Sequence, residues 1–169
     1  MAGRNVGIAL VLIVVLFLAL GTIIALRYVM GDQGEGQGGV SLYFGRSSEQ
    51  KLNLQPAKVK EVVKMIRERH GINSSKAIVM FGTTTCPYCK AQDEMFSQQF
   101  KELYKPLWVN LDEKAQATFI ELVSAELQAG ASPEVYGVPH TVVVSGDDIK
   151  AIVIGLVRER SFWEGLLKD

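Results

Sequence analysis

The chain has 169 residues, and its 18 basic and 18 acidic side chains leave no net charge at pH 7. Proteins that bind nucleic acid usually carry a basic excess or patch, and nothing in this balanced sequence indicates one. Cys86 and Cys89 are the only cysteines, so a framework of structural disulfides is excluded.

An uncharged and almost wholly apolar run covers residues 6–26. These 21 residues would span about 31 Å as a helix, which matches a hydrocarbon core about 30 Å thick. Arg4 and Arg27 flank the run, and Tyr28 falls at its far interface, as is typical of membrane-spanning helices. We therefore expect a transmembrane helix at about residues 6–29 that anchors the protein in a lipid bilayer.

A cleaved signal peptide is the alternative interpretation of this segment. Ala19-Leu20-Gly21 could serve as a weak cleavage site. The apolar run continues past that site to Leu26, which makes it too long for the core of a signal peptide. The length of the run therefore favours an anchor.

The charges beside the anchor give only a slight preference for one orientation. Arg4 precedes it, whereas Arg27 and the acidic Asp32 and Glu35 follow it. Basic residues favour the cytoplasmic side, and their numbers are nearly equal. We expect the N-terminus inside and the following domain outside the cytoplasm.

Three regions follow from this pattern. Residues 1–30 form the membrane segment, and residues 31–39 contain five glycines among polar side chains, which is typical of a flexible linker. Residues 40–169 remain for one domain, which is long enough to form a hydrophobic core.

The first half of this domain contains a short predicted strand at 40–44 and a predicted helix at 56–70. The helix has apolar residues on one face, Pro56 at its start and Gly71 after its end, and both positions suit those residues. His70 is predicted to be a helix-end residue and not a metal ligand.

The remaining elements are predicted from hydrophobic periodicity and turn residues. Ser161 and Glu164 form a capping-box pattern that would open the last helix. The predicted elements are a buried strand at 77–82, a helix that includes 91–96, a strand at 107–112, a helix at 115–128, a hairpin of strands 141–144 and 149–154, and a helix from 161 to 167.

Cys86-Pro87-Tyr88-Cys89 lies between the strand at 77–82 and the helix that follows. Cys86 would occupy the helix N-terminus, with Pro87 as the first helical residue. Unpaired N–H groups at that end favour negative charge and hence a thiolate. Cys89 follows one helical turn later, close enough to form a small disulfide ring. This spacing is typical of a redox dithiol.

The order β-α-β-α-β-β-α, with Cys-x-x-Cys at the first strand-to-helix junction, resembles the thioredoxin fold, an α/β fold with a central mixed sheet flanked by helices. Pro139, in the sequence Gly137-Val138-Pro139, follows 53 residues after Cys86. It lies immediately before the hairpin, where thioredoxin-like proteins have a cis-proline that faces the dithiol. The resemblance covers roughly residues 40–169. It implies that Pro139 is cis and that the Val138 backbone contacts an extended substrate segment.

The subfamily stays open. Cys-Pro-Tyr-Cys is typical of glutaredoxins, but Thr83 and Gly137 stand where glutaredoxins usually have a lysine and a threonine that hold glutathione. Residues 155–159 replace their Gly-Gly-x-x-Asp. Met80 stands where thioredoxins have a buried aspartate. The resemblance thus implies a thiol–disulfide oxidoreductase that acts on protein disulfides or dithiols, with weak glutathione binding.

We assign the attacking role to Cys86 and the resolving role to Cys89, and expect Tyr88 to face the protein partner. His140 could tune the dithiol or contact the substrate, but a solvent-facing residue at the start of a strand is the favoured interpretation. No cofactor is required, and the electron donor or acceptor is not identified. The direction of electron flow depends on the redox potential of the pair relative to its compartment.

Two other interpretations of the dithiol remain. A zinc site needs four ligands, and only His70 and His140 could join the cysteines; an iron–sulfur cluster shared between subunits is a variant of this hypothesis. An inert disulfide in a membrane-tethered binding module is the second. Catalysis is favoured because a purely structural pair does not need proline at the first helical position.

Overall fold

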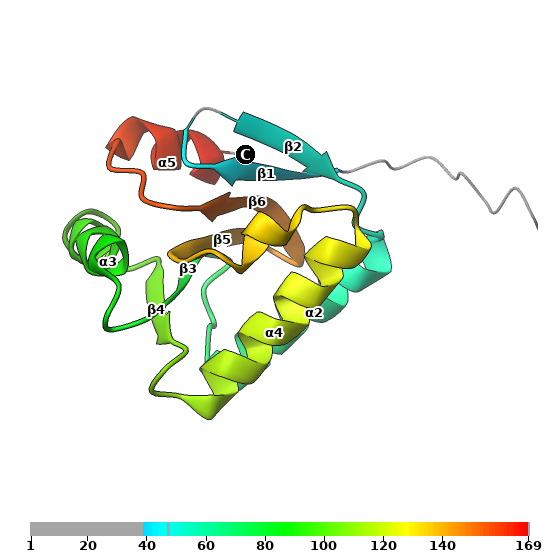
Figure 1. The fold of residues 1–169 in the computed structure, drawn as a ribbon, viewed down its shortest axis with the longest axis horizontal. Coiled ribbons are helices and arrows are strands. Elements are labelled where there is room, and N and C mark those ends of the chain that lie inside the picture. Colours follow the sequence, from blue (N-terminus) through cyan, green and yellow to red (C-terminus); the bar gives the residue numbers. More distant parts are fainter. Residues whose placement is uncertain (1–38, 47, 169) are drawn as a thin grey trace, which may run out of the picture. The chain divides into compact units, whose positions relative to one another are not determined.

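A six-stranded mixed sheet runs through the part of the chain that the computed structural model describes, residues 39–46 and 48–168 (Figure 1). The predicted membrane segment and most of the predicted linker lie outside these residues. Within them, every helix is too short or too polar to span a bilayer.

The helices and strands follow one another in an order close to the predicted one. They are β1 (Val40–Phe44), β2 (Ser48–Leu52), α2 (Pro56–His70), β3 (Lys76–Gly82), α3 (Pro87–Gln99), β4 (Tyr104–Trp108), α4 (Glu113–Gln128), the 3₁₀ helix η1 (Pro133–Tyr136), β5 (His140–Ser145), β6 (Asp148–Ile154) and α5 (Arg160–Leu167). From residue 76 onward the predicted succession of strands and helices is confirmed.

The strand order in the sheet is β2-β1-β6-β5-β3-β4. β3 pairs in parallel with β4 and antiparallel with β5, and β5 forms the predicted hairpin with β6. β6 pairs in parallel with β1, which forms a second hairpin with β2. β4 and β2 are therefore the two edges of the sheet.

Helices α2 and α4 cover one face of the sheet, and α3 and α5 cover the other (Figure 1). β3 shows why its sequence is continuously apolar: Val79 and Phe81 pack on the α2/α4 side, whereas Ile78 and Met80 pack on the α3/α5 side. A strand that is covered on both faces needs apolar side chains at every position. This central strand leads directly to the dithiol.

The prediction of a strand at 107–112 is wrong in its position. β4 begins at Tyr104, opposite Ile78, and ends at Trp108, opposite Gly82. The chain then turns, because the N–H groups of Leu111 and Asp112 both donate to the Trp108 carbonyl. The strand tolerates its proline because an edge strand pairs on one side only.

The structure also contains a strand that was not predicted and lacks a predicted capping box. β2 is polar, and an edge strand without alternating apolar residues gives little hydrophobic signal in the sequence. The capping box is wrong: Glu159 occupies the N-cap of α5 and its side chain makes no capping bond. Glu164 instead pairs with Arg160 at 2.7 Å, so its carboxylate does not reach back to the cap.

Gln92 joins α3 to the chain that follows β6. Its side chain is fully buried; Oε1 accepts from the Val157 N–H at 2.8 Å, and Nε2 donates to the Val157 carbonyl at 3.1 Å. The Trp163 indole N–H donates to the same carbonyl at 2.9 Å. Both backbone groups of Val157 are thus satisfied inside the α3/α5 core, as buried polar groups must be.

We predict that Gln92→Met destabilises the protein by about 1–3 kcal/mol, because the buried Val157 N–H loses the acceptor that Gln92 Oε1 provides. The Val157 carbonyl keeps its bond from Trp163. Urea unfolding of the full chain in non-ionic detergent measures the change. Gln98→Met is the matched control, since Gln98 is exposed on the same helix. Equal losses of stability in the two variants would contradict this role of Gln92.

Candidate functional site

The dithiol occupies the N-terminus of α3, as the sequence predicts. Cys86 is the N-cap and Pro87 the first helical residue. The Cys89 N–H donates to Cys86 Sγ at 3.2 Å, so the sulfur takes the place of the oxygen that usually caps a helix. A bond of this kind is stronger when the acceptor is charged. The Cys86 sulfur is therefore held at the N-terminal end of α3 by a backbone N–H group.

The two sulfurs differ in environment. Both cysteines are free thiols; Cys86 is partly exposed, whereas Cys89 is completely buried. Burial, with a smaller contribution from the hydrogen bond to Cys86, raises the pKa of Cys89 to about 12. Cys89 is thus a protonated thiol at neutral pH. One accessible sulfur lies beside one shielded proton-bearing sulfur.

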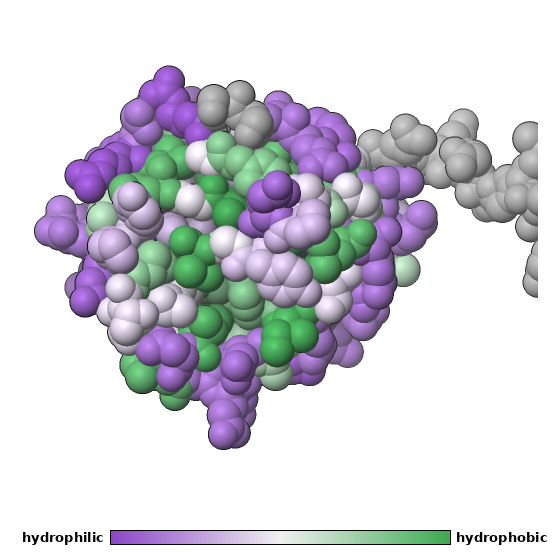
Figure 2. Space-filling model, in the orientation of Figure 1, coloured by the Kyte–Doolittle hydropathy of each residue, from purple (hydrophilic) through white to green (hydrophobic). Residues whose placement is uncertain are grey.

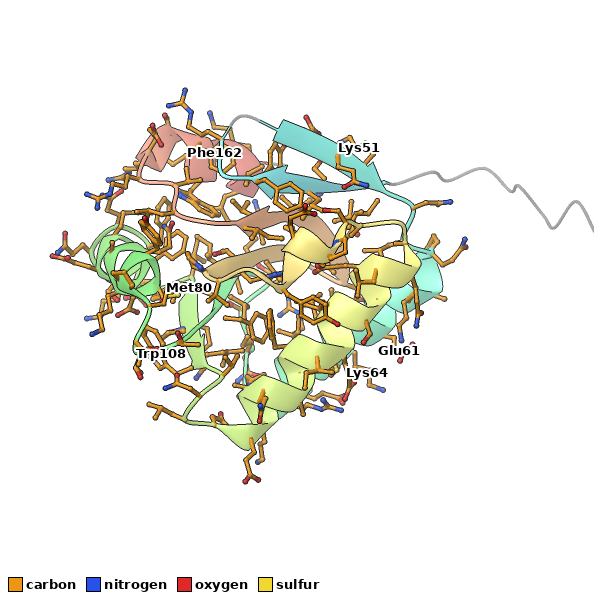
Figure 3. The ribbon with its side chains drawn as sticks, in the orientation of Figure 1. Lys51, Glu61, Lys64, Met80, Trp108 and Phe162 are labelled. Atoms are coloured by element: carbon orange, nitrogen blue, oxygen red, sulfur yellow. The ribbon has the colours of Figure 1, made fainter. Side chains whose placement is uncertain are left out.

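Gly82 allows Cys89 to pack against the end of β3. A Cβ at this position would lie 3.1 Å from Cys89 Cβ, 3.3 Å from Cys89 Sγ and 3.3 Å from Trp108 Cζ3. A larger residue would displace Cys89 Sγ or the indole ring of Trp108. Figure 3 labels Trp108 at the end of β4 and Met80 in the interior. The sequence analysis missed Gly82, although a glycine that ends a buried strand can indicate a close approach.

The predicted cis-proline segment lies against the dithiol. The Val138–Pro139 peptide bond is cis, and Cys86 Sγ lies 3.8 Å from the Val138 carbonyl oxygen. Pro139 itself is buried, whereas Val138 is partly exposed. The backbone of Val138 therefore borders the accessible sulfur.

Asn110 connects the loop after β4 with the loop before the dithiol. Its Oδ1 accepts from the Thr84 N–H at 3.0 Å, and its Nδ2 donates to Thr84 Oγ1 at 2.7 Å. This pair of bonds fixes the approach of the chain to Cys86. Asn110 was predicted to lie inside the strand 107–112 and was given no role at the site, whereas it follows β4.

The favoured prediction that His140 faces solvent is wrong. β5 lies inside the sheet, and the ring of His140 is fully buried between Phe81 and Phe119. Nδ1 lies 3.0 Å from the Val135 carbonyl, so this nitrogen carries a proton. Nε2 lies 3.0 Å from Glu126 Oε1. Both ring nitrogens are engaged on the α2/α4 face, so neither is free to contact a substrate.

His70 is the other histidine that a metal site would need. It lies in the last turn of α2, as predicted, and its Nε2 bonds Thr118 Oγ1 at 3.0 Å. Within residues 39–46 and 48–168, no group of three Cys, His, Asp or Glu side chains is placed to hold a metal ion. Cys86 and Cys89 therefore lie beside Val138 and Pro139. The imidazole rings of His70 and His140 bond to Thr118 and Glu126 instead.

Three large apolar side chains are exposed in the segments that carry the dithiol, Asn110 and the approach to the cis-proline: one on α3, one after β4 and one at the end of η1. Tyr88 is 62% exposed, Leu111 71% and Tyr136 56%. Tyr88 lies between the cysteines, Leu111 follows Asn110, and Tyr136 precedes the cis-proline segment. Figure 2 shows apolar and weakly polar residues gathered in the middle of one face, over η1 and the strands beside it, with charged residues around them. Such exposed apolar groups are typical of contact surfaces.

Comparison of the chain with protein-family models, with curated protein sequences and with solved structures gives no match.

We predict that iodoacetamide at pH 7.5 modifies Cys86 and leaves Cys89 unmodified in the native full chain. Only a thiolate reacts, and a pKa raised to about 12 keeps Cys89 protonated until the solution is strongly alkaline. Mass spectrometry of the digested protein measures labelling at each cysteine. In urea at the same pH both cysteines should react. Equal labelling of the two residues in the native protein would contradict the difference in their environments.

Proposed function

We propose that the protein is a thioredoxin-like thiol–disulfide oxidoreductase that acts through Cys86 and Cys89. The observation that carries this proposal is the pairing of an accessible sulfur at a helix N-terminus with a buried, protonated sulfur one turn later. A purely structural disulfide would not need this asymmetry. The cis-proline segment beside Cys86 and the confirmed order of elements after residue 76 support the thioredoxin-like assignment.

In the reducing direction the Cys86 thiolate attacks one sulfur of a substrate disulfide. A bond forms between Cys86 and that sulfur, and the other substrate sulfur leaves as a thiolate. Cys89 then loses its proton and attacks Cys86 Sγ, which releases the second substrate thiolate. The leaving thiolates take up protons. The substrate gains two electrons, and Cys86 and Cys89 become a disulfide.

The same steps in reverse oxidise a substrate dithiol. The direction depends on the reduction potential of the Cys86–Cys89 pair relative to its compartment and to its protein partner. The partner that restores the pair after each cycle is a thiol donor in the reducing direction and a disulfide or another two-electron oxidant in the oxidising direction. We propose that residues 6–26 anchor the enzyme in a membrane with its domain outside the cytoplasm.

Protein substrates fit the site better than glutathione does. A threonine at position 137, usual in glutaredoxins, would place a Cβ 3.0 Å from Ile154 Cγ2 and 3.2 Å from the Glu134 carbonyl oxygen. Such contacts require neighbouring atoms to move. Residues 155–159, which replace the Gly-Gly-x-x-Asp, are tied to α3 through Gln92. The exposed Tyr88 and the Val138 backbone instead offer an extended surface for a polypeptide.

The test uses two single variants of the full chain. Cys89→Ser should accumulate mixed disulfides with an oxidised protein such as insulin, because attack by Cys86 survives and resolution is lost. Cys86→Ser should trap little and lose at least about 99% of insulin reduction, since Cys89 is protonated and shielded. Non-reducing electrophoresis and mass spectrometry detect the adducts.

Thr85→Ser is the matched control for these variants, because it changes an exposed residue next to the dithiol and keeps both sulfurs. It should retain activity and trap nothing. Trapping by Cys86→Ser but not by Cys89→Ser would reverse the two assigned roles. Unchanged exchange in both cysteine variants would rule out the proposed enzyme.

A further inference from the structure

A cationic cavity opens at the β4 edge of the sheet. Its volume is about 410 Å³, and it lies between the C-terminal turn of α2, strand β4 and the first turn of α4. The charged residues that line it are Arg69, Lys105, Asp112 and Lys114, and His70 lies among them. The lining thus contains three permanent cations and one carboxylate. The dithiol chemistry proposed above uses none of these groups.

Two of the cations are uncompensated. Arg69 pairs with Glu121 at 2.8 Å, and Asp112 is engaged as the N-cap of α4, where its carboxylate accepts from the Lys114 N–H at 2.8 Å. Among the described residues, the side chains of Lys105 and Lys114 form no ion pair, and both are exposed. The cavity therefore presents unpaired positive charge to the solvent.

His70 does not supply this charge. The Thr118 hydroxyl donates to the Lys114 carbonyl at 2.8 Å, so it can only accept from His70, whose Nε2 must carry the proton. Burial lowers the pKa of His70; Asp112 opposes that shift, whereas Lys105 and Lys114 add to it. At neutral pH the imidazole is uncharged. The unpaired positive charge comes from Lys105 and Lys114.

The loop that follows β4 lines the cavity and also bonds the chain that leads to the dithiol. Trp108 and Leu111 line the cavity, and between them Asn110 holds Thr84, two residues before Cys86. Leu111 is 71% exposed and offers an apolar contact beside the lysines. A polypeptide whose cysteine reaches Cys86 can therefore continue along this loop into the cavity.

We propose that this cavity binds an acidic stretch of the substrate polypeptide, next to the cystine that meets Cys86. The proposal rests on the proposed function. Charge complementarity supports it, because Lys105 on β4 and Lys114 on α4 both line the same open cavity. An extended chain with several carboxylates and an apolar residue can meet both lysines and Leu111 together. Charges at such a rim raise the rate of association and select between partners.

The experiment uses disulfide-bonded peptides whose cystine is flanked by three Asp or Glu residues, or by three Asn or Gln residues. The full chain in non-ionic detergent should reduce the acidic peptide with a kcat/KM about tenfold higher at low salt, as expected for two exposed charge pairs. Salt at 0.5 M should remove most of this preference through screening. The double variant Lys105→Glu/Lys114→Glu should abolish or reverse it.

Lys58→Glu/Lys64→Glu is the matched control, with the same change in net charge. Lys58 and Lys64 are on α2 in ion pairs with Glu61 and Glu68, and Figure 3 shows Lys64 well apart from Trp108. This variant should keep the preference for the acidic peptide. Reduction of a small uncharged disulfide, such as hydroxyethyl disulfide, should be the same in all three proteins. Loss of the preference in both double variants, or its survival in Lys105→Glu/Lys114→Glu, would overturn the proposal.

A measurement of peptide binding tests the cavity independently of the proposed dithiol chemistry. A fluorescent acidic peptide with serine in place of both cysteines should bind the full chain, and its affinity should fall about tenfold in Lys105→Glu/Lys114→Glu only. If binding behaves in this way while no disulfide is reduced, the proposed function fails and the cavity stands as an acidic-peptide site. If the small disulfide is reduced but neither binding nor rate depends on the lysines, the cavity proposal fails alone.

Discussion

The hydrogen bond from the Cys89 N–H to Cys86 Sγ, at 3.2 Å, is the interaction on which the proposed chemistry depends. It places the accessible sulfur at the positive end of α3, where orphan N–H groups favour a negative charge. The same turn of helix carries Cys89 into the core, where burial raises its pKa to about 12. One local motif therefore places an accessible sulfur at the helix end beside a buried thiol that keeps its proton.

This motif is held from both faces of the sheet. On the α3/α5 face, Gln92 fixes α3 to Val157, and Gly82 lets Cys89 approach β3. On the α2/α4 face, His140 ties Val135 of η1 to Glu126 of α4. Because Nδ1 donates to a carbonyl, a single proton lies between Nε2 and Glu126 whichever of the two carries it.

Burying the His140–Glu126 pair reduces the stability of the fold through desolvation. Both side chains are fully buried, and Glu126 Oε2 has no hydrogen-bond partner among the described residues. Removing one member of such a pair commonly costs several kcal/mol, about 3–5. The place of this pair in the fold indicates its structural role. Val135 and His140 bracket the cis-proline segment, so the pair fixes both ends of the backbone that borders Cys86.

The strand 77–82, the helix 56–70 and the dithiol position could be predicted because each has a strong local signal. A strand buried on both faces is continuously apolar, and Pro56 and Gly71 mark the ends of a helix. β2 and the correct bounds of β4 could not be predicted, because both are edge strands. An edge strand can be polar, as β2 is, and its unpaired side tolerates a proline such as Pro106. The burial of His140 depends on Glu126, which lies 14 residues away in the sequence and on another element. Gly82 is important because it leaves room for Cys89 and Trp108, which lie on other elements. None of these long-range contacts leaves a periodic pattern in the sequence.

The central claim is that Cys86 and Cys89 form a reversible two-electron couple. The most direct test is the reduction potential of this pair in the full chain, measured by equilibration with dithiothreitol and glutathione buffers and by counting free thiols. The account predicts a reversible disulfide between the two residues with a potential above about −300 mV, outside the range of structural disulfides. A potential well below that value, or cysteines that never form a disulfide with each other, would contradict it.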